Sequence, residues 1–194
     1  MRIKMKKIFL SLIILFAANC AFAYQSFFGF SVGLASGIPF YGSAYVNDCN
    51  KSMSDPSRII VGTLASANFN VSDNATFFIG SDLICDFIWK GSQYSNHLNY
   101  DFSLGIKVFP NLAGFCAGLA YVLGARTDFV ETDEVSKFSD TSAWGNGIKI
   151  LAEYNFAHDG KSRYYPTLGM YWKILPRGSH TWDNSICAYI MANL

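Results

Sequence analysis

One pattern constrains this chain more than any other: large apolar residues alternate, position by position, with small or charged ones. Residues 100–108 have the sequence YDFSLGIKV, and residues 115–123, which follow a Pro-Asn turn, continue the pattern as FCAGLAYVL. Successive side chains of a β-strand point to opposite faces of the sheet. A period of two therefore predicts strands with one large apolar face and one face of small and charged residues.

The alternation recurs in eight segments, which predicts eight strands. They span residues 27–35, 58–71, 76–89, 100–108, 115–124, 144–156, 164–175 and 185–194. In the last segment Ile186, Ile190 and Leu194 share one parity while Tyr189 and Met191 occupy the other, so its facing stays open. Aromatic residues make up 16% of the chain, and because Tyr and Phe favour strands we expect an all-β fold.

The links between these segments differ in length in a regular way. Short links at 72–75, 110–114 and 157–163 alternate with longer ones at 37–57, 90–97, 126–143 and 176–184. An even number of strands joined alternately by short turns and long loops is the pattern of an outer-membrane barrel, whose long loops lie outside the cell. We therefore predict an eight-stranded antiparallel up-and-down transmembrane β-barrel.

The N-terminal residues indicate the compartment. A basic segment, MRIKMKK, precedes the apolar run IFLSLIILFAA and the small-residue site Ala21-Phe22-Ala23. This order is typical of a secretory signal peptide, so we predict a signal at 1–23 and a barrel domain at 24–194. The signal carries four of the 15 basic residues and none of the 14 acidic ones, which leaves 11 against 14. A weakly acidic mature chain argues against nucleic acid as a partner.

The charged residues indicate which face meets lipid. Within the strands they share the parity of Gly and Ser and avoid the face of the large apolar residues. The large set would overfill the interior of an eight-stranded barrel, whereas small residues suit a narrow lumen. We therefore expect the large residues to face lipid. A secreted soluble barrel that carries an apolar ligand inside is the alternative, and it reverses both faces.

A balanced set of charges is then expected inside the lumen. It comprises Asp82, Asp86, Asp101, Lys107, Arg126, Lys149, Glu153 and Lys173. Buried charges persist when they are paired and hydrogen-bonded, so we predict an interlocked polar network. Within it, we expect Asp86 and Asp101 to lie close together in the upper lumen, with Arg126 and Lys173 as their cations. Independently hydrated charges are the other possibility.

Aromatic residues cluster near the predicted strand ends. Trp89, Tyr100, Trp144 and Trp172 lie near the loop ends, and Phe69, Phe77, Phe156 and Tyr164 lie near the turn ends. Two such belts are typical of the aromatic girdles that membrane barrels place at the two interfaces.

At this level the chain resembles the small eight-stranded outer-membrane barrels, a group that includes the OmpA transmembrane domain, OmpX and OmpW. The resemblance covers residues 24–194 and rests on architecture. It implies a surface-exposed barrel without enzymatic activity, placed in a lipopolysaccharide-type membrane by the outer-membrane assembly machinery. The OmpW-like members imply an alternative, a narrow conduit for small hydrophobic molecules. Members usually end in an aromatic residue, whereas this chain ends in Leu194.

The sequence gives little sign of catalytic or metal chemistry. Ser95 and His97 in one predicted loop, and Ser179 and His180 in another with Asp183 nearby, are the candidate nucleophiles and bases. Neither pair has an identifiable oriented acid, so we predict no catalytic site.

The His and Cys residues lack the spacing of metal ligands, so we predict neither a metal site nor a cofactor. Cys49 in the first loop and Cys187 near the top of the last strand are a candidate disulfide, with free thiols as the alternative.

Overall fold

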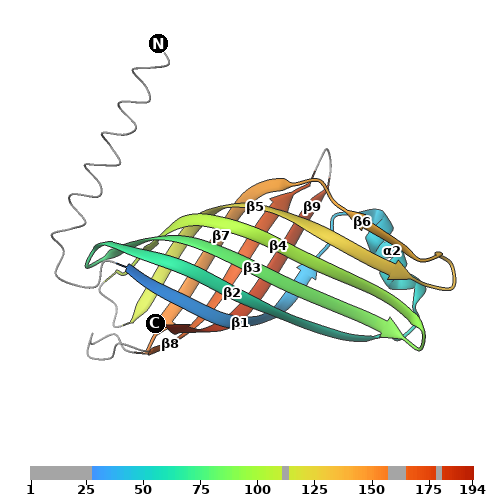
Figure 1. Cartoon of the computed structure of the whole chain (residues 1–194), viewed down its shortest axis with the longest axis horizontal. Coiled ribbons are helices and arrows are strands. Elements are labelled where there is room, and N and C mark those ends of the chain that lie inside the picture. The colour runs from blue at the N-terminus through green and yellow to red at the C-terminus, as the bar shows by residue number, and fades with distance from the viewer. Residues whose placement is uncertain (1–27, 111–113, 157–164, 178–180) are drawn as a thin grey trace, which may run out of the picture.

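Eight long antiparallel strands form a closed barrel (Figure 1). The computed structural model describes residues 28–110, 114–156, 165–177 and 181–194; the predicted signal peptide lies outside them. The barrel strands are β1 (Phe28–Phe40), β2 (Ser57–Ser72), β3 (Ala75–Lys90), β4 (Gln93–Val108), β5 (Phe115–Glu131), β7 (Gly145–Asn155), β8 (Tyr165–Pro176) and β9 (Trp182–Asn193). Each pairs with its neighbour in the chain, and β1 closes the barrel against β9. The predicted fold class is confirmed.

Two further elements lie at the loop end of the barrel. Helix α2 (Ala44–Ser52) occupies the link between β1 and β2, and the Ser43 side chain caps it by accepting from the backbone N of Val46. The four-residue strand β6 (Phe138–Thr141) pairs with the end of β5. Among the described residues, no helix is sufficiently long and apolar to cross a membrane.

The link between β3 and β4 differs from the predicted long loop. The two strands stay paired up to Lys90 and Gln93, so Gly91 and Ser92 alone join them. Gly91 has a φ of 60°, which glycine adopts without the steric cost that a Cβ brings, and which suits a two-residue hairpin. The predicted loop at 90–97 was therefore wrong, and Ser95 and His97 lie within β4.

Side-chain exposure follows the predicted faces. On β4, Phe102 is 58% exposed and Leu104 is 48% exposed, whereas the intervening Ser103 is 3% exposed. On β9, Ile186 and Ile190 face outward while Tyr189 and Met191 are buried, which decides the facing of the last strand. A β-carbon at Gly169 would overlap the Tyr189 ring. That glycine on β8 therefore makes room for the ring inside the barrel.

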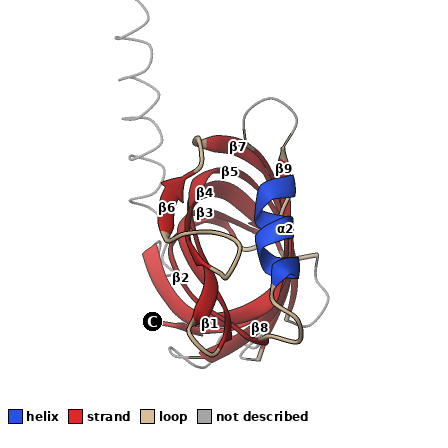
Figure 2. Ribbon diagram, turned by 90° about the vertical axis from the view of Figure 1, so that its right-hand side faces the viewer, coloured by secondary structure: helices blue, strands red, loops and turns tan. Residues whose placement is uncertain are grey.

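The lumen is packed with side chains. An apolar cluster fills part of it, made of Ala35, Leu64, Phe78, Ile84, Ala120, Leu151, Tyr171, Cys187, Tyr189 and Met191. Figure 2 shows α2 and its flanking loops at the loop end of the barrel.

The rim at the loop end is uneven. Strand β5 pairs with β7 only as far as Gly124, but it continues beside β4 to Glu131. The strands β3, β4 and β5 therefore reach further than β7 at the end of the barrel where α2 lies (Figure 1).

Candidate functional site: the closed lumen and its mouth

Three ion pairs cross the lumen. Lys149 Nζ lies 2.6 Å from Asp82 Oδ2, Lys107 Nζ lies 2.8 Å from Glu153 Oε1, and Lys173 Nζ donates to Asp101 Oδ2. All six side chains are buried. Each pair joins strands that are not neighbours in the barrel, so the lumen is bridged from wall to wall.

The predicted cluster of Asp86, Asp101, Arg126 and Lys173 is divided in the structure. Lys173 and Asp101 meet as expected. The expected closeness of Asp86 and Asp101 was wrong, because the two-residue turn sets a register in which Asp101 lies opposite Asp82 and Asp86 lies opposite His97. Asp86 and Arg126 instead belong to two separate polar groups at the mouth of the barrel.

Asp86 is the centre of the first group. Arg58 Nε and Nη2 donate to its two carboxylate oxygens, each at 2.8 Å, and the Tyr41 hydroxyl donates to Oδ2 at 2.7 Å. Asp86 is fully buried, while the Arg58 side chain is 40% exposed. Burial, the charge of Asp86 and this hydrogen bond raise the pKa of Tyr41 well above its ordinary value. The phenol therefore stays protonated and remains a donor.

The second group joins Arg126 to the rim. Arg126 Nε donates to Asp128 Oδ1 at 2.7 Å, and its Nη1 donates to Asp183 Oδ2. Arg177 Nε donates to the same oxygen of Asp183 at 2.6 Å. This group ties the loop end of β5 to the start of β9 and, through Asp183, to Arg177 just after β8. The neighbouring candidates Ser179 and His180 lie outside the described residues.

His97 connects a side chain of α2 to the barrel wall. His97 Nδ1 lies 2.7 Å from Asp128 Oδ1, and Nε2 lies 3.1 Å from Ser95 Oγ and 3.0 Å from Asn50 Oδ1. Ser95, His97 and Asp128 thus have the bonding order of a nucleophile, base and acid. Ser95 is fully buried, however, and its hydroxyl donates to Asn50 Oδ1 at 2.6 Å. Ser95 Oγ is therefore out of contact with solvent in this structure.

Asp128 and Arg58 were missing from the predicted network. Asp128 falls within the long link predicted at 126–143, because the fifth strand was expected to span only 115–124. The alternation in fact continues, since Thr127 and Phe129 face outward while Arg126 and Asp128 face inward. Extending the same period of two would have found Asp128. It would not have found Tyr41, which lies beyond the end of β1.

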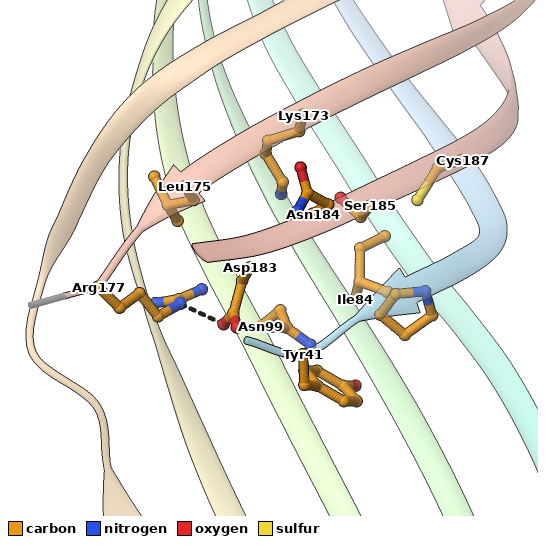
Figure 3. A pocket seen from close by; sticks show the side chains of 11 residues that line it. Tyr41, Ile84, Asn99, Lys173, Leu175, Arg177, Asp183, Asn184, Ser185 and Cys187 are labelled. Carbon is orange, nitrogen blue, oxygen red and sulfur yellow. Dashed lines mark hydrogen bonds and ion pairs between the residues drawn. The ribbon is translucent and has the colours of Figure 1, made fainter. Parts of the chain in front are cut away.

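Two small cavities lie inside the barrel, each of about 20 Å³, which is room for about one water molecule. The cavity nearer the loop end of the barrel lies beside Tyr41, Lys173 and Arg177 (Figure 3). Two of its lining atoms, Asn99 Nδ2 and Ser185 Oγ, are buried without a hydrogen-bond partner among the described residues. Side chains therefore fill much of the described lumen, and these two spaces between them are small.

Comparison with known proteins supports this architecture. No family model and no curated protein matches the chain. Among solved structures, Ail of Yersinia pestis superposes with a TM-score of 0.56 at 7% identity, covering 86% of this chain and 97% of Ail. Ail bound to the heparin analogue sucrose octasulfate gives 0.55 at 8% identity, with the same coverage. Neisserial surface protein A gives 0.50 at 13% identity, covering 86% of this chain and 96% of that protein.

This chain has the fold of the small eight-stranded outer-membrane barrels. At identities this low, the likeness concerns the fold alone. The belt of exposed apolar side chains around the strands agrees with it, because such a surface is stable against lipid and unstable against water.

The aromatic residues of this outer-membrane barrel are distributed as follows. Trp89, Trp144, Trp172 and Phe156 are exposed on the outer surface, Tyr100, Phe69 and Phe77 are half-buried, and Tyr164 lies outside the described residues. Tyr100 and Trp144 pack edge to face with their ring centroids 5.8 Å apart, and the centroids of Phe69 and Phe77 are 6.2 Å apart.

Of the two alternatives for Cys49 and Cys187, the structure has the free thiols. Cys49 is buried in α2 over the mouth. Cys187 lies within the barrel on β9, opposite Gly37 of β1. The helix, which the sequence analysis did not predict, holds Cys49 in the loop instead of against the strand.

Proposed function

We propose that this protein is an integral outer-membrane barrel without enzymatic activity, and that its loop end serves structural or interaction roles at the cell surface. Residues 1–23 act as the export signal in this proposal. The outer-membrane assembly machinery inserts the barrel, and lipid and the lipopolysaccharide-type leaflet surround it. The exposed aromatic residues then form the two interfacial girdles.

The observation that carries the proposal is the filling of the lumen by side chains. Three cross-lumen ion pairs and the apolar cluster occupy the interior. A conduit for small hydrophobic molecules needs a continuous path, and the two cavities each hold about one water molecule. The same filling supports the absence of enzymatic activity, because Ser95 is fully buried.

Planar-bilayer recording tests the closed lumen. Wild-type protein is expected to insert without stepwise conductance. A matched variant, Tyr171→Gly with Tyr189→Gly, removes two lumen rings and serves as the open control. Stepwise conductance of the wild type, resembling that of the variant, would overturn the proposal and favour the conduit.

Refolding separates the membrane barrel from a soluble carrier. Residues 24–194 are expected to fold only in detergent or lipid, and the folded form should migrate differently on a gel before and after boiling. A monodisperse folded protein in buffer alone would contradict the membrane barrel and favour the soluble carrier.

A further inference from the structure

Tyr41 occupies the mouth of the barrel as a ligand occupies a binding site. The residue is 8% exposed. Its ring centroid lies 4.6 Å from that of His97 and 4.9 Å from Arg126 Cζ, and its hydroxyl donates to Asp86 Oδ2 at 2.7 Å. The three contacting side chains come from β3, β4 and β5, whereas Tyr41 belongs to the link that follows β1.

The three contacting groups are held by the barrel itself. Arg58 donates a hydrogen bond to each carboxylate oxygen of Asp86. Asp128 bonds both His97 and Arg126. These four bonds join barrel residues and do not involve Tyr41, so they can persist when the ring leaves.

The chemistry of the site selects a phenol. A guanidinium group favours the face of an aromatic ring. A buried carboxylate favours a hydroxyl donor, and a hydrogen bond to a charged acceptor is among the stronger ones. An aromatic ring without a hydroxyl leaves one oxygen of Asp86 with a bond fewer, which costs affinity. A carboxylate ligand is disfavoured by the charge of Asp86.

The segment that brings Tyr41 is attached mainly through side chains. The Asp183 carboxylate accepts a hydrogen bond from the backbone N of Gly42 at 2.9 Å. The Asn50 side-chain oxygen is hydrogen-bonded to Ser95 Oγ and His97 Nε2. Residues 41–56 are not paired as a strand with the barrel. Arg58, next to the site, is 40% exposed at its side chain. A ligand reaches the carboxylate by displacing this loop, in which Val46, Cys49 and Met53 are also buried.

We propose that the barrel mouth is a binding site for a 4-hydroxyphenyl group, and that Tyr41 is its internal occupant and competitor. The ligand is a free phenol or the tyrosine side chain of an exposed peptide segment. The inference goes beyond the proposed function and does not depend on whether the lumen conducts.

The test uses the mature barrel in detergent with Tyr41→Ala, which empties the site. N-acetyl-tyrosinamide and p-cresol are the two probes, and each has a matched analogue without the hydroxyl, N-acetyl-phenylalaninamide and toluene. Both phenols are expected to raise the melting temperature of Tyr41→Ala and to leave that of the wild type unchanged at the same concentration. The analogues should bind at least about tenfold more weakly. Adding Asp86→Asn should abolish the preference for the hydroxyl.

The two probes distinguish the sources. A response to both supports a tyrosine side chain as the ligand, and a response to p-cresol alone supports a small phenol. Equal effects of phenols and analogues, or no effect of any probe, would overturn the proposal.

A second measurement keeps the proposal testable if Tyr41→Ala does not fold. Cys49 is a free thiol, 3% exposed, in the loop that carries Tyr41. In the wild type, an excess of N-acetyl-tyrosinamide or p-cresol is expected to accelerate maleimide labelling of Cys49, located by peptide mass, relative to the matched analogues. Unchanged labelling over a titration into the millimolar range with both phenols would contradict the proposal.

Discussion

The Nζ atom of Lys149 on β7 lies 2.6 Å from Oδ2 of Asp82 on β3, across the part of the lumen that β4 and β5 enclose. Both side chains are buried. Removing one partner of a buried ion pair strands the other charge, whereas removing both can be nearly neutral. Lys149→Met is therefore expected to lower the free energy of unfolding in detergent by about 3–5 kcal/mol. Adding Asp82→Leu should restore most of that loss, and a double variant as unstable as the single one would show that the pair is not coupled.

Arg126 holds the mouth together through several contacts at once. It bonds Asp128 and Asp183 and lies over the ring of Tyr41. Arg126→Met leaves two buried carboxylates with fewer partners, so a loss of about 3–5 kcal/mol is expected in the same unfolding measurement. Lys137→Met, at an exposed lysine in the link between β5 and β6, is the control and should change stability by less than about 0.5 kcal/mol. Equal stability of the two variants would remove the structural role of Arg126.

Acid is expected to weaken the mouth through Asp128, which lies in the part of β5 that continues beyond β7. Burial raises its pKa, but hydrogen bonds from His97 and Arg126 outweigh burial and lower it below its ordinary value of 3.8. A lowered folded-state pKa stabilises the protein above the unfolded-state value, and this contribution is lost as the pH falls through the folded-state value. The difference in free energy of unfolding between wild type and Asp128→Asn should have its full size at about pH 6 and should decline below pH 3.8. A difference that stays constant down to about pH 2 would exclude this linkage.

Ser95 is expected to be unreactive despite its position beside His97 and Asp128. Its hydroxyl is fully buried and bonded to Asn50, and a nucleophile must be reached by the acyl or phosphonyl group that it attacks. A fluorophosphonate probe should therefore leave the folded wild type unlabelled, as it leaves Ser95→Ala. Labelling of the wild type that disappears in Ser95→Ala would refute the non-enzymatic proposal.

Much of the barrel could be predicted because strand facing is a local property. A period of two along residues 100–108 assigns each side chain to a face without any knowledge of its neighbours. Charge then separates the faces, since Lys107 and Asp101 are stable inside a polar lumen and unstable against lipid. The eight strands and the lipid-facing side followed from these two facts.

The partners inside the lumen could not be predicted in the same way. They depend on register, and one short turn at Gly91 moved Asp101 opposite Asp82 instead of beside Asp86. They also depend on the first loop, whose helix α2 places Cys49 over the mouth, away from Cys187.

The sequence by itself determined the eight strands, their inward and outward faces for all but the last, and the character of the lumen, because alternation and charge act residue by residue. The tertiary structure alone decided that Tyr41 meets Asp86, that Asp128 meets His97 and that β9 turns Tyr189 inward. The physical reason is that the two contacts join residues that are distant in the chain, so strand register and the first loop set their distances. The facing of β9 is likewise set by its pairing with β1 and β8 when the barrel closes.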